Sequence, residues 1–383
     1  MFARLFDYIR DMIRQADLLL LALCSASTLY GMVLIASATN FRNTYRYVIV
    51  QGVGLVLGMV LFFFLSSVDV GELSKKWKWL FAFNIGFICL LLTPIGVVRN
   101  NSRAWLSIPG FPVDIQPAEI VKVSFILLLA RQLAYLQEQE DLRSFRNAIQ
   151  PTFHTLFMVG LIYVISSDAG SALVYIVAFI CMAFAAGLAK RWLALGLGGG
   201  ASALVAVWKL DLLPGYMRDR ILVIFDHSYD VMGKGWQQTR SMLALGSGQL
   251  TGQGLFAGTQ TQSAFKSSLP ERQTDFIFSV CGEELGFLGC LLVIVLLLAI
   301  VVRCLLVARD AATRMEALVC VGFAAVLMFQ TIANIGMCLF LLPVIGLTLP
   351  FFSYGGSSIV TLFAAMGIVS GIHKRSRPEW LMN

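Results

Sequence analysis

The chain has 383 residues, of which 58% are hydrophobic and only 13% are charged, and its mean hydropathy is +0.79. A soluble domain carries about 25% charged residues, so this composition excludes a water-soluble globular protein. The net charge of +7 does not indicate nucleic-acid binding, because the basic residues are spread between apolar segments and form no patch.

Ten apolar segments are long enough to cross a hydrocarbon core of about 30 Å as helices. They lie at residues 17–38, 46–68, 77–98, 117–136, 152–168, 170–189, 191–210, 276–302, 315–342 and 349–372. The predicted fold class is therefore an all-α polytopic membrane protein with about ten transmembrane helices. We treat residues 1–383 as one membrane domain.

The connections between these segments differ in their content of basic residues. Alternate connections and the two termini carry 17 Lys and Arg, whereas the short connections on the other side carry 4. Lys and Arg are enriched in cytoplasmic connections. The chain is therefore predicted to cross the plasma membrane with both termini, residues 1–16 and 373–383, in the cytoplasm.

One connection on the outer side, residues 211–275, is 65 residues long. Loops of this length are usually functional or disordered, and the amphipathic stretch at 236–245 favours an ordered loop. It contains six basic residues, and Arg218, Arg220 and Arg272 are candidates for holding a phosphate group.

Glu119 and Lys122 are three positions apart near the start of the fourth segment, after Pro117. This spacing places the carboxylate and the ammonium on one face of a helix, where they can neutralise each other. Ionisable residues at membrane depth are often functional, so a structural ion pair and a substrate-binding role both remain open. Asp168, which precedes the sixth segment, is predicted to cap that helix.

The densest polar cluster is Glu271, Arg272 and Asp275, where the long loop meets the eighth segment. Such a cluster could hold a phosphate and supply a base, although Asp275 could equally cap the helix that follows. Ser353 and Tyr354 begin the last segment among small residues, which favours either close helix packing or a wall of a substrate groove. The eight cysteines are scattered and lack metal-ligand spacing, so no metal site is predicted.

Together these segments resemble the SEDS family (shape, elongation, division and sporulation), the group of RodA and FtsW, from about residue 17 to 373. The motifs that carry the resemblance are Arg103-Ala-Trp105, Gln116-Pro-Ala-Glu119, Asp168-Ala-Gly170, Ala244-Leu-Gly-Ser-Gly248, Leu269-Pro-Glu-Arg-Gln-Thr-Asp275-Phe-Ile-Phe278, Gly282-Glu-Glu-Leu-Gly286, Asn334-Ile-Gly-Met337 and Ser353-Tyr-Gly-Gly-Ser357. Ala104, Ala118 and the Ser167-Asp168-Ala169 run depart from the family pattern. The Asn334 motif leans toward a RodA-like or sporulation-type paralogue.

The resemblance implies a peptidoglycan glycosyltransferase that polymerises lipid II on the outer face of the cytoplasmic membrane, in cell elongation, division or sporulation. It implies that Asp275 is the catalytic carboxylate and that Trp105 is functionally important. It also implies a class B penicillin-binding protein as partner, for which Phe287, Gly289 and Phe323 on the eighth and ninth segments are the predicted docking surface. No cofactor is identified with certainty, and it stays open whether a divalent cation, Mg²⁺ or Mn²⁺, bridges Asp275 and a pyrophosphate.

The implied chemistry needs a base for the attacking sugar hydroxyl and cations for the lipid pyrophosphate. Asp275 is the candidate base, and Arg218, Arg220, Arg272 and Lys122 are the candidate cations. Two other functions remain open: a transporter that flips lipid II without chemistry, for which Glu119 and Lys122 could line a polar path, and a scaffold that only recruits the crosslinking enzyme.

Overall fold

The computed structural model describes residues 15–99, 102–110, 113–139, 144–211, 215–226, 235–265 and 268–376. Most of the predicted N-terminal tail and the end of the C-terminal tail therefore lie outside the described residues. The described elements are α2 (Leu18–Asn40), α3 (Arg46–Ser66), α4 (Val70–Lys75), α5 (Trp77–Cys89), a 3-10 turn (Leu90–Leu92), β1 (Gly96–Arg99), β2 (Ser102–Leu106), α6 (Pro117–Glu138), α7 (Phe145–Ser166), α8 (Ala169–Ala185), α9 (Lys190–Lys209), α10 (Gly215–Phe225), α11 (Trp236–Ser247), α12 (Ile277–Asp310), α13 (Arg314–Cys338) and α14 (Gly356–Ser376).

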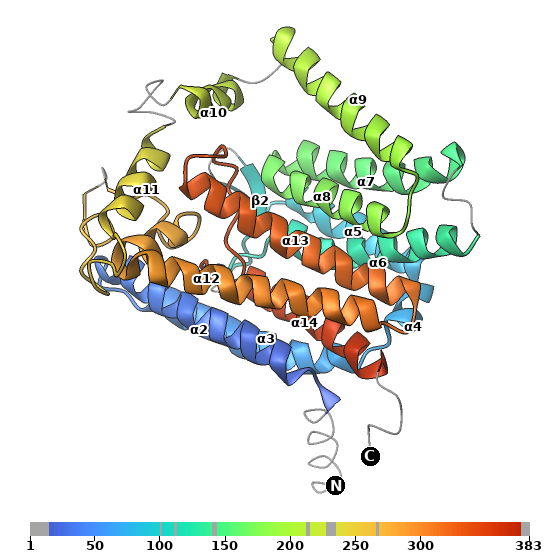
Figure 1. Ribbon diagram of the computed structural model, residues 1–383, viewed down its shortest axis with the longest axis horizontal. Helices are drawn as coiled ribbons and strands as arrows, with labels where there is room; N and C mark the ends of the chain where they lie inside the picture. The colour runs from blue at the N-terminus through green and yellow to red at the C-terminus, as the bar shows by residue number, and fades with distance from the viewer. Residues whose placement is uncertain are drawn as a thin grey trace, which may run out of the picture.

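Ten of these helices correspond to the ten predicted segments: α2, α3, α5, α6, α7, α8, α9, α12, α13 and α14, and Figure 1 shows how they are arranged. Seven described helices, α2, α3, α7, α9, α12, α13 and α14, are long and apolar enough to span a bilayer. The apolar stretches Trp77–Leu92 and Ala169–Ala185 are shorter, and α6 has 22 residues that include the buried Glu119 and Lys122. The prediction of an all-α polytopic protein with about ten transmembrane helices is confirmed.

Close helix packing holds the bundle together, most extensively between α3 and α14 and between α12 and α13. Gly367 and Gly371 of α14 lie one turn apart and approach the backbone of Phe62 and Ser66 on α3 so closely that a Cβ at either glycine would collide with it. Small residues at such positions allow helix backbones to meet inside a membrane, where association depends on packing. By contrast, α9 stands apart at the top of Figure 1, and its hydrophobic window has no buried residue.

Several predicted boundaries are wrong, and prolines account for most of the errors. The third segment ends at Leu92 because Pro94 interrupts it, and Gly96–Arg99 then pairs antiparallel with Ser102–Leu106. The ninth helix ends at Cys338 rather than 342, before Pro343. The tenth begins at Gly356 rather than 349, after Pro350. The two-stranded hairpin is the one sheet among the described residues and was not predicted.

The eighth helix, α12, extends to Asp310 rather than 302 and is broken at Gly286, where φ is 66° and ψ is −162°. Loop residues supply the hydrogen bonds that the break leaves unmade: Gln253 N donates to Glu283 O and Gly254 N to Glu284 O, each at 2.9 Å. Phe287 N in turn donates to Gln249 O at 2.9 Å. Irregular backbone is tolerated at membrane depth where protein satisfies its polar groups, and here the long loop does so.

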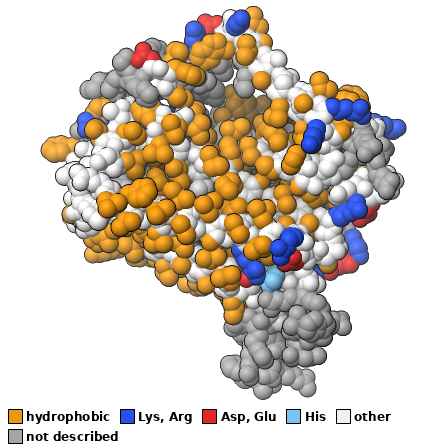
Figure 2. Space-filling view, in the orientation of Figure 1, with side chains coloured by type: hydrophobic (Ala, Val, Ile, Leu, Met, Phe, Trp, Pro, Cys, Tyr) orange, Lys and Arg blue, Asp and Glu red, His pale blue; other side chains and the backbone are white. Residues whose placement is uncertain are grey.

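The bundle has two different ends. At one end, the described start and finish of the chain meet, because Asp17 N donates to Ser370 Oγ at 2.9 Å and Arg303 Nε binds Asp17 Oδ2 at 2.8 Å. At the other end lie α11 and the loop that leads into α12 (Figure 1). Figure 2 shows hydrophobic side chains over the broad middle of one face, with Lys and Arg side chains at its margins.

Candidate active site

Asp275 lies in a tight turn just before α12, at the end of the bundle formed by the long loop. The turn begins at Glu271, whose φ is 43°, and Thr274 N and Phe276 N both donate to Glu271 O. Asn334 on α13 donates through Nδ2 to Asp275 O at 2.8 Å. These bonds fix the backbone of Asp275, and through it the position of the side chain.

Residues before the last helix hold the same turn from the other side. Ser353 Oγ donates to Thr274 O at 2.6 Å and accepts from Leu349 N at 2.8 Å. Tyr354 N donates to Gln273 O at 2.9 Å. Both residues were predicted as packing or groove residues, and the contacts of Ser353 and of the Tyr354 backbone position the Asp275 turn. A substrate contact by either side chain stays a prediction.

The Asp275 carboxylate is half-buried, and no described residue donates a hydrogen bond to it. Asp275 does not cap α12, because the capping position is Phe276 and no side chain caps that helix. Burial, together with the negative charges of Glu271 and Asp168, raises the pKa of Asp275 to about 7, although the positive charge of Arg220 acts in the opposite direction. The carboxylate is therefore poised to exchange a proton near neutral pH.

The predicted cations occupy different places. Arg220 on α10 is close enough to Asp275 for its positive charge to lower the pKa of that carboxyl group. Its Nη1 donates to Val344 O at 2.8 Å. Arg218, on the same helix, instead pairs with Asp211 and lies over the Trp208 ring, 5.5 Å from its centroid. Arg220 is thus the cation that the fold brings to Asp275.

Arg272 is buried inside the long loop. Its guanidinium donates to Thr261 O, to Gln260 O at 3.3 Å and to Ser263 O at 3.0 Å, and it lies 3.9 Å from the centroid of the Phe41 ring. Burial lowers the pKa of Arg272 to about 10, so it remains charged at neutral pH. These contacts favour a role in shaping the loop over the predicted contact with a phosphate.

Asp168 caps α8, as predicted: its Oδ1 accepts from Ser171 N at 2.9 Å and its Oδ2 accepts from Ser171 Oγ at 2.7 Å. Oδ2 also accepts from Gln116 Nε2 at 3.2 Å, which joins the starts of α6 and α8. One turn along α6, Lys122 Nζ and Glu119 Oε1 form the expected ion pair at 2.8 Å, and both residues are buried. This pair neutralises itself within the bundle.

Trp105 lies on β2, opposite Val97 of β1, and is half-buried. The hairpin is tied to the end of α7, since Ser102 Oγ donates to Ser166 O at 2.7 Å. Ser166 is two residues before Asp168, so the hairpin is at the same end of the bundle as Asp168. Among the described residues no contact joins Trp105 to Asp275, and a substrate contact by Trp105 stays a prediction.

Glu283 and Glu284 are fully buried acids to which sequence analysis assigned no role. Glu283 accepts hydrogen bonds from Gln260 N and Thr261 N, at 2.7 and 2.8 Å. Glu284 accepts from Ser37 Oγ at 2.5 Å and from Gln262 Nε2 at 2.9 Å. We call this pair the glutamate clamp. The sequence feature that could have predicted this clamp is the pair of adjacent acids together with the glycine-rich loop, because a glycine-rich backbone offers unhindered N–H donors.

A divalent cation at Asp275 was left open by the sequence. Glu271 and Asp168 contribute negative charge there, but the described residues contain no cluster of three His, Cys, Asp or Glu side chains that could hold a metal ion. A metal at this site would therefore depend on ligands from the substrate, such as pyrophosphate oxygens.

The comparisons with known proteins extend over nearly the whole chain. Stage V sporulation protein E of Bacillus subtilis is 33% identical over 369 residues, which cover 94% of this chain and 98% of that protein. The peptidoglycan glycosyltransferase MrdB of Escherichia coli K12 is 33% identical over 290 residues, covering 75% of this chain and 76% of that one.

Solved structures agree with the sequence relatives. A chain from a structure described as "Structural coordination of polymerization and crosslinking by a peptidoglycan synthase complex" has a TM-score of 0.80 at 30% identity and covers 95% of this chain and 99% of that one. The FtsW/RodA/SpoVE profile, described as cell cycle protein, matches residues 16–378. The chain therefore belongs to the FtsW/RodA/SpoVE family of cell cycle proteins.

Proposed function

We propose that the chain is a peptidoglycan glycosyltransferase that polymerises lipid II on the outer face of the bacterial cytoplasmic membrane. One observation carries this proposal: Asp275 is a half-buried carboxylate without a hydrogen-bond donor among the described residues, and its pKa is about 7. A general base works best when its pKa lies near the working pH. Relatives such as MrdB are named peptidoglycan glycosyltransferases, which supports the same function.

The reaction joins two lipid-linked sugars. Asp275 accepts the proton of a sugar hydroxyl as the hydroxyl oxygen bonds to the anomeric carbon of the donor. The bond from that carbon to the lipid pyrophosphate breaks, and the pyrophosphate leaves with the electron pair. One carboxylate acting as base is consistent with inversion at the anomeric carbon.

Arg220 is the residue we assign to the leaving pyrophosphate. Its charge acts on Asp275, and among the described residues only Nη1 donates a hydrogen bond, to Val344 O. An arginine has five N–H donors, so Arg220 retains donors for a phosphate oxygen. Its charge also keeps the pKa of Asp275 from rising further. Trp105, Glu119, Lys122, Arg218, Glu271, Ser353 and Tyr354 remain predicted substrate contacts at this end of the bundle.

We place the Asp275 end outside and the end that carries both described chain termini in the cytoplasm. The basis is the asymmetry in basic residues, 17 in the connections and termini on one side against 4 in the short connections on the other, and Asp17 N bonds to Ser370 Oγ at the end that carries both described termini. Residues 211–275 are then the outer loop, carrying α10 and α11. A cysteine introduced at Gln253 should react in intact cells with a reagent that does not cross membranes. Labelling only after permeabilisation would reverse the orientation.

We propose a class B penicillin-binding protein as the partner, supported by the resemblance to a chain of a peptidoglycan synthase complex. The predicted docking residues need correction, because Phe323 is 4% exposed and Gly289 is packed against Tyr30. Of that set, Phe287 is exposed, and it continues into Leu291 and Val295 on the outer face of α12. Val295→Trp should weaken co-purification of the partner. Val205→Trp, on the exposed face of α9, is the matched control, and equal loss in both would argue against this surface.

The decisive experiment incubates the purified full-length chain with lipid II and sizes the products on a gel. The chain should form glycan polymers, and Asp275→Asn should lower the rate at least about 100-fold while removing only the charge. Glu72→Gln, an exposed carboxylate paired with Lys75, is the matched control and should polymerise normally. An Asp275→Asn protein that polymerises lipid II at a near wild-type rate would show that Asp275 is not the catalytic base.

The same assay separates the other functions. A lipid II transporter or a scaffold would form no polymer with either the wild type or Asp275→Asn. The internal neutralisation of Glu119 by Lys122 gives no specific support to a polar transport path.

A further inference from the structure

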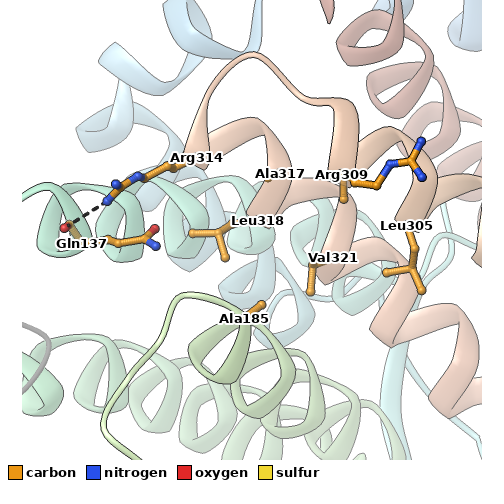
Figure 3. Close-up of a pocket in the computed structure, with 9 residues that line it drawn as sticks. Gln137, Ala185, Leu305, Arg309, Arg314, Ala317, Leu318 and Val321 are labelled. Carbon is orange, nitrogen blue, oxygen red and sulfur yellow. Dashed lines mark hydrogen bonds between the residues drawn. The ribbon is translucent and has the colours of Figure 1, made fainter.

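A second concave site lies far from Asp275, at the end of the bundle where the described chain termini meet, which we call the termini-bearing end. There α6, α8 and α12 end and α13 begins. The site is a cavity of about 330 Å³. Its lining includes Gln137 on α6, Ala185 on α8, Leu305 on α12, and Arg314, Leu318 and Val321 on α13. Figure 3 shows that these residues come from separate helices that surround an open space.

The lining is charged at the rim of the cavity and apolar deeper in the bundle. Arg314 and Arg309 lie at the rim, whereas Val321 is seven residues further along α13. A helix rises 1.5 Å per residue, so the apolar lining continues about 10 Å beyond the rim into the bundle. Such a shape suits a ligand with a charged head and a hydrocarbon chain.

The two arginines have donors available for an anion. Arg314 Nη1 donates to Gln137 O at 3.3 Å, which is its one hydrogen bond among the described residues (Figure 3). Arg309 pairs with Asp310, at 2.8 Å from Nε to Oδ1, and these side chains are 71% and 53% exposed. Exposed ion pairs contribute little free energy, so Arg309 can exchange Asp310 for another anion at small cost.

We propose that this cavity binds one anionic glycerophospholipid from the leaflet at the termini-bearing end, with its phosphate at Arg314 and an acyl chain along Leu305, Leu318 and Val321. The occupant is a lipid because the apolar part of the cavity lies among membrane-spanning helices. It is anionic because Asp310 pairs with Arg309, whereas Arg314 has no ion pair among the described residues and leaves a positive charge at the rim. Basic pockets between helices near the cytoplasmic surface bind anionic lipid headgroups.

Native mass spectrometry of the purified full-length chain tests the site without any assay of polymerisation. The chain is titrated with phosphatidylglycerol and, separately, with phosphatidylcholine of the same acyl chains. The wild type should retain one phosphatidylglycerol in preference to phosphatidylcholine. Arg314→Gln should weaken retention about fivefold, the usual contribution of one basic residue. Ala317→Trp should abolish it by filling the cavity.

Lys76→Gln is the matched control, since Lys76 is an exposed basic residue at the same end of the bundle but outside the cavity lining. It should retain phosphatidylglycerol like the wild type. Thermal unfolding of each variant confirms the fold, and Arg314→Gln decides the matter if Ala317→Trp does not fold. Equal retention by wild type and Arg314→Gln, or equal retention of phosphatidylcholine, would overturn the proposal. A preference for undecaprenyl phosphate over phosphatidylglycerol would overturn the glycerophospholipid assignment.

Discussion

Asp275 and the glutamate clamp are carboxylates at the same end of the bundle, and they have opposite surroundings. Each clamp carboxylate is fully buried and accepts several hydrogen bonds from the loop at 253–262. Asp275 is half-buried, is held only through its backbone, and accepts no side-chain hydrogen bond among the described residues. A carboxylate whose acceptor sites are all used stabilises the fold, whereas one with free acceptor sites is available to a substrate.

Glu119 and Lys122 show a third arrangement, in which a carboxylate is satisfied by a cation rather than by N–H and O–H donors. If a carboxylate with a bound partner serves stability, the Glu119–Lys122 pair stabilises the bundle, as the glutamate clamp does. Removing one partner of a buried ion pair costs about 3–5 kcal/mol of unfolding free energy, because the other charge is left unpaired. Lys122→Met should therefore strongly lower the thermal unfolding midpoint, which gives the largest effect that we expect.

The exchanged variant, Glu119→Lys with Lys122→Glu, separates structure from substrate binding. If the pair is only structural, the exchange should restore much of the stability and of the polymerisation. If Lys122 also binds phosphate, the exchanged protein should be stable but inactive. The pair would then take part in the reaction, as we propose for Asp275, and would not serve stability alone. A wild-type unfolding midpoint in Lys122→Met would contradict both interpretations.

The clamp itself is tested by Glu284→Gln. Glu284 Oε2 accepts from Ser37 Oγ and Phe256 N, and Oε1 accepts from Gln262 Nε2, so either oxygen that becomes an amide nitrogen faces a donor. An unmade hydrogen bond at a buried group costs about 1–3 kcal/mol. We expect a lower unfolding midpoint, with polymerisation lost in proportion to folding.

The matched control for the clamp is Glu72→Gln, which changes a carboxylate that is 68% exposed. This variant should unfold at the wild-type temperature. If Glu284→Gln instead retained full stability and lost polymerisation, Glu284 would act on the reaction, and the division between clamp and site would fail.

The membrane-crossing part of the fold was predictable because one physical rule governs it: apolar runs of sufficient length form helices in lipid. That rule located all ten helices, and the positions of Glu119, Lys122 and Asp168 predicted an ion pair and a cap that the structure contains. Helix ends were less predictable, since Pro94, Pro343 and Pro350 lie inside apolar runs that continue on both sides.

The site was predictable as a list of residues but not as an arrangement. Arg218, Arg220 and Arg272 are indistinguishable as loop arginines in the sequence. In the structure Arg218 pairs with Asp211, the charge of Arg220 acts on Asp275, and Arg272 is buried inside the loop. These differences depend on contacts between residues far apart in the chain. The break at Gly286 was hidden for the same reason, because the partners that satisfy it lie about 35 residues earlier.

The smallest expected effect, and the most specific to Asp275, is on the pH dependence of polymerisation. The pKa of Asp275 is about 7, whereas its ordinary value is 3.8. Only the deprotonated carboxylate accepts a proton, so the rate should rise about tenfold per pH unit below 7 and level off above it. The initial rate of polymerisation between pH 5.5 and 8.5 measures this directly. The residual activity of Asp275→Asn should lack the inflection.

The same raised pKa has a consequence of opposite sign for stability. Between about pH 4 and 7 the folded chain holds the Asp275 proton and the unfolded chain does not, so this group's contribution to the unfolding free energy falls as pH rises through that window. The clamp glutamates are present in both proteins and cancel when Asp275→Asn is compared with wild type. The variant should therefore lose less stability than the wild type between pH 4 and 7. If the two proteins had parallel stability curves and the wild-type rate showed no inflection near pH 7, Asp275 would be no more available than the clamp.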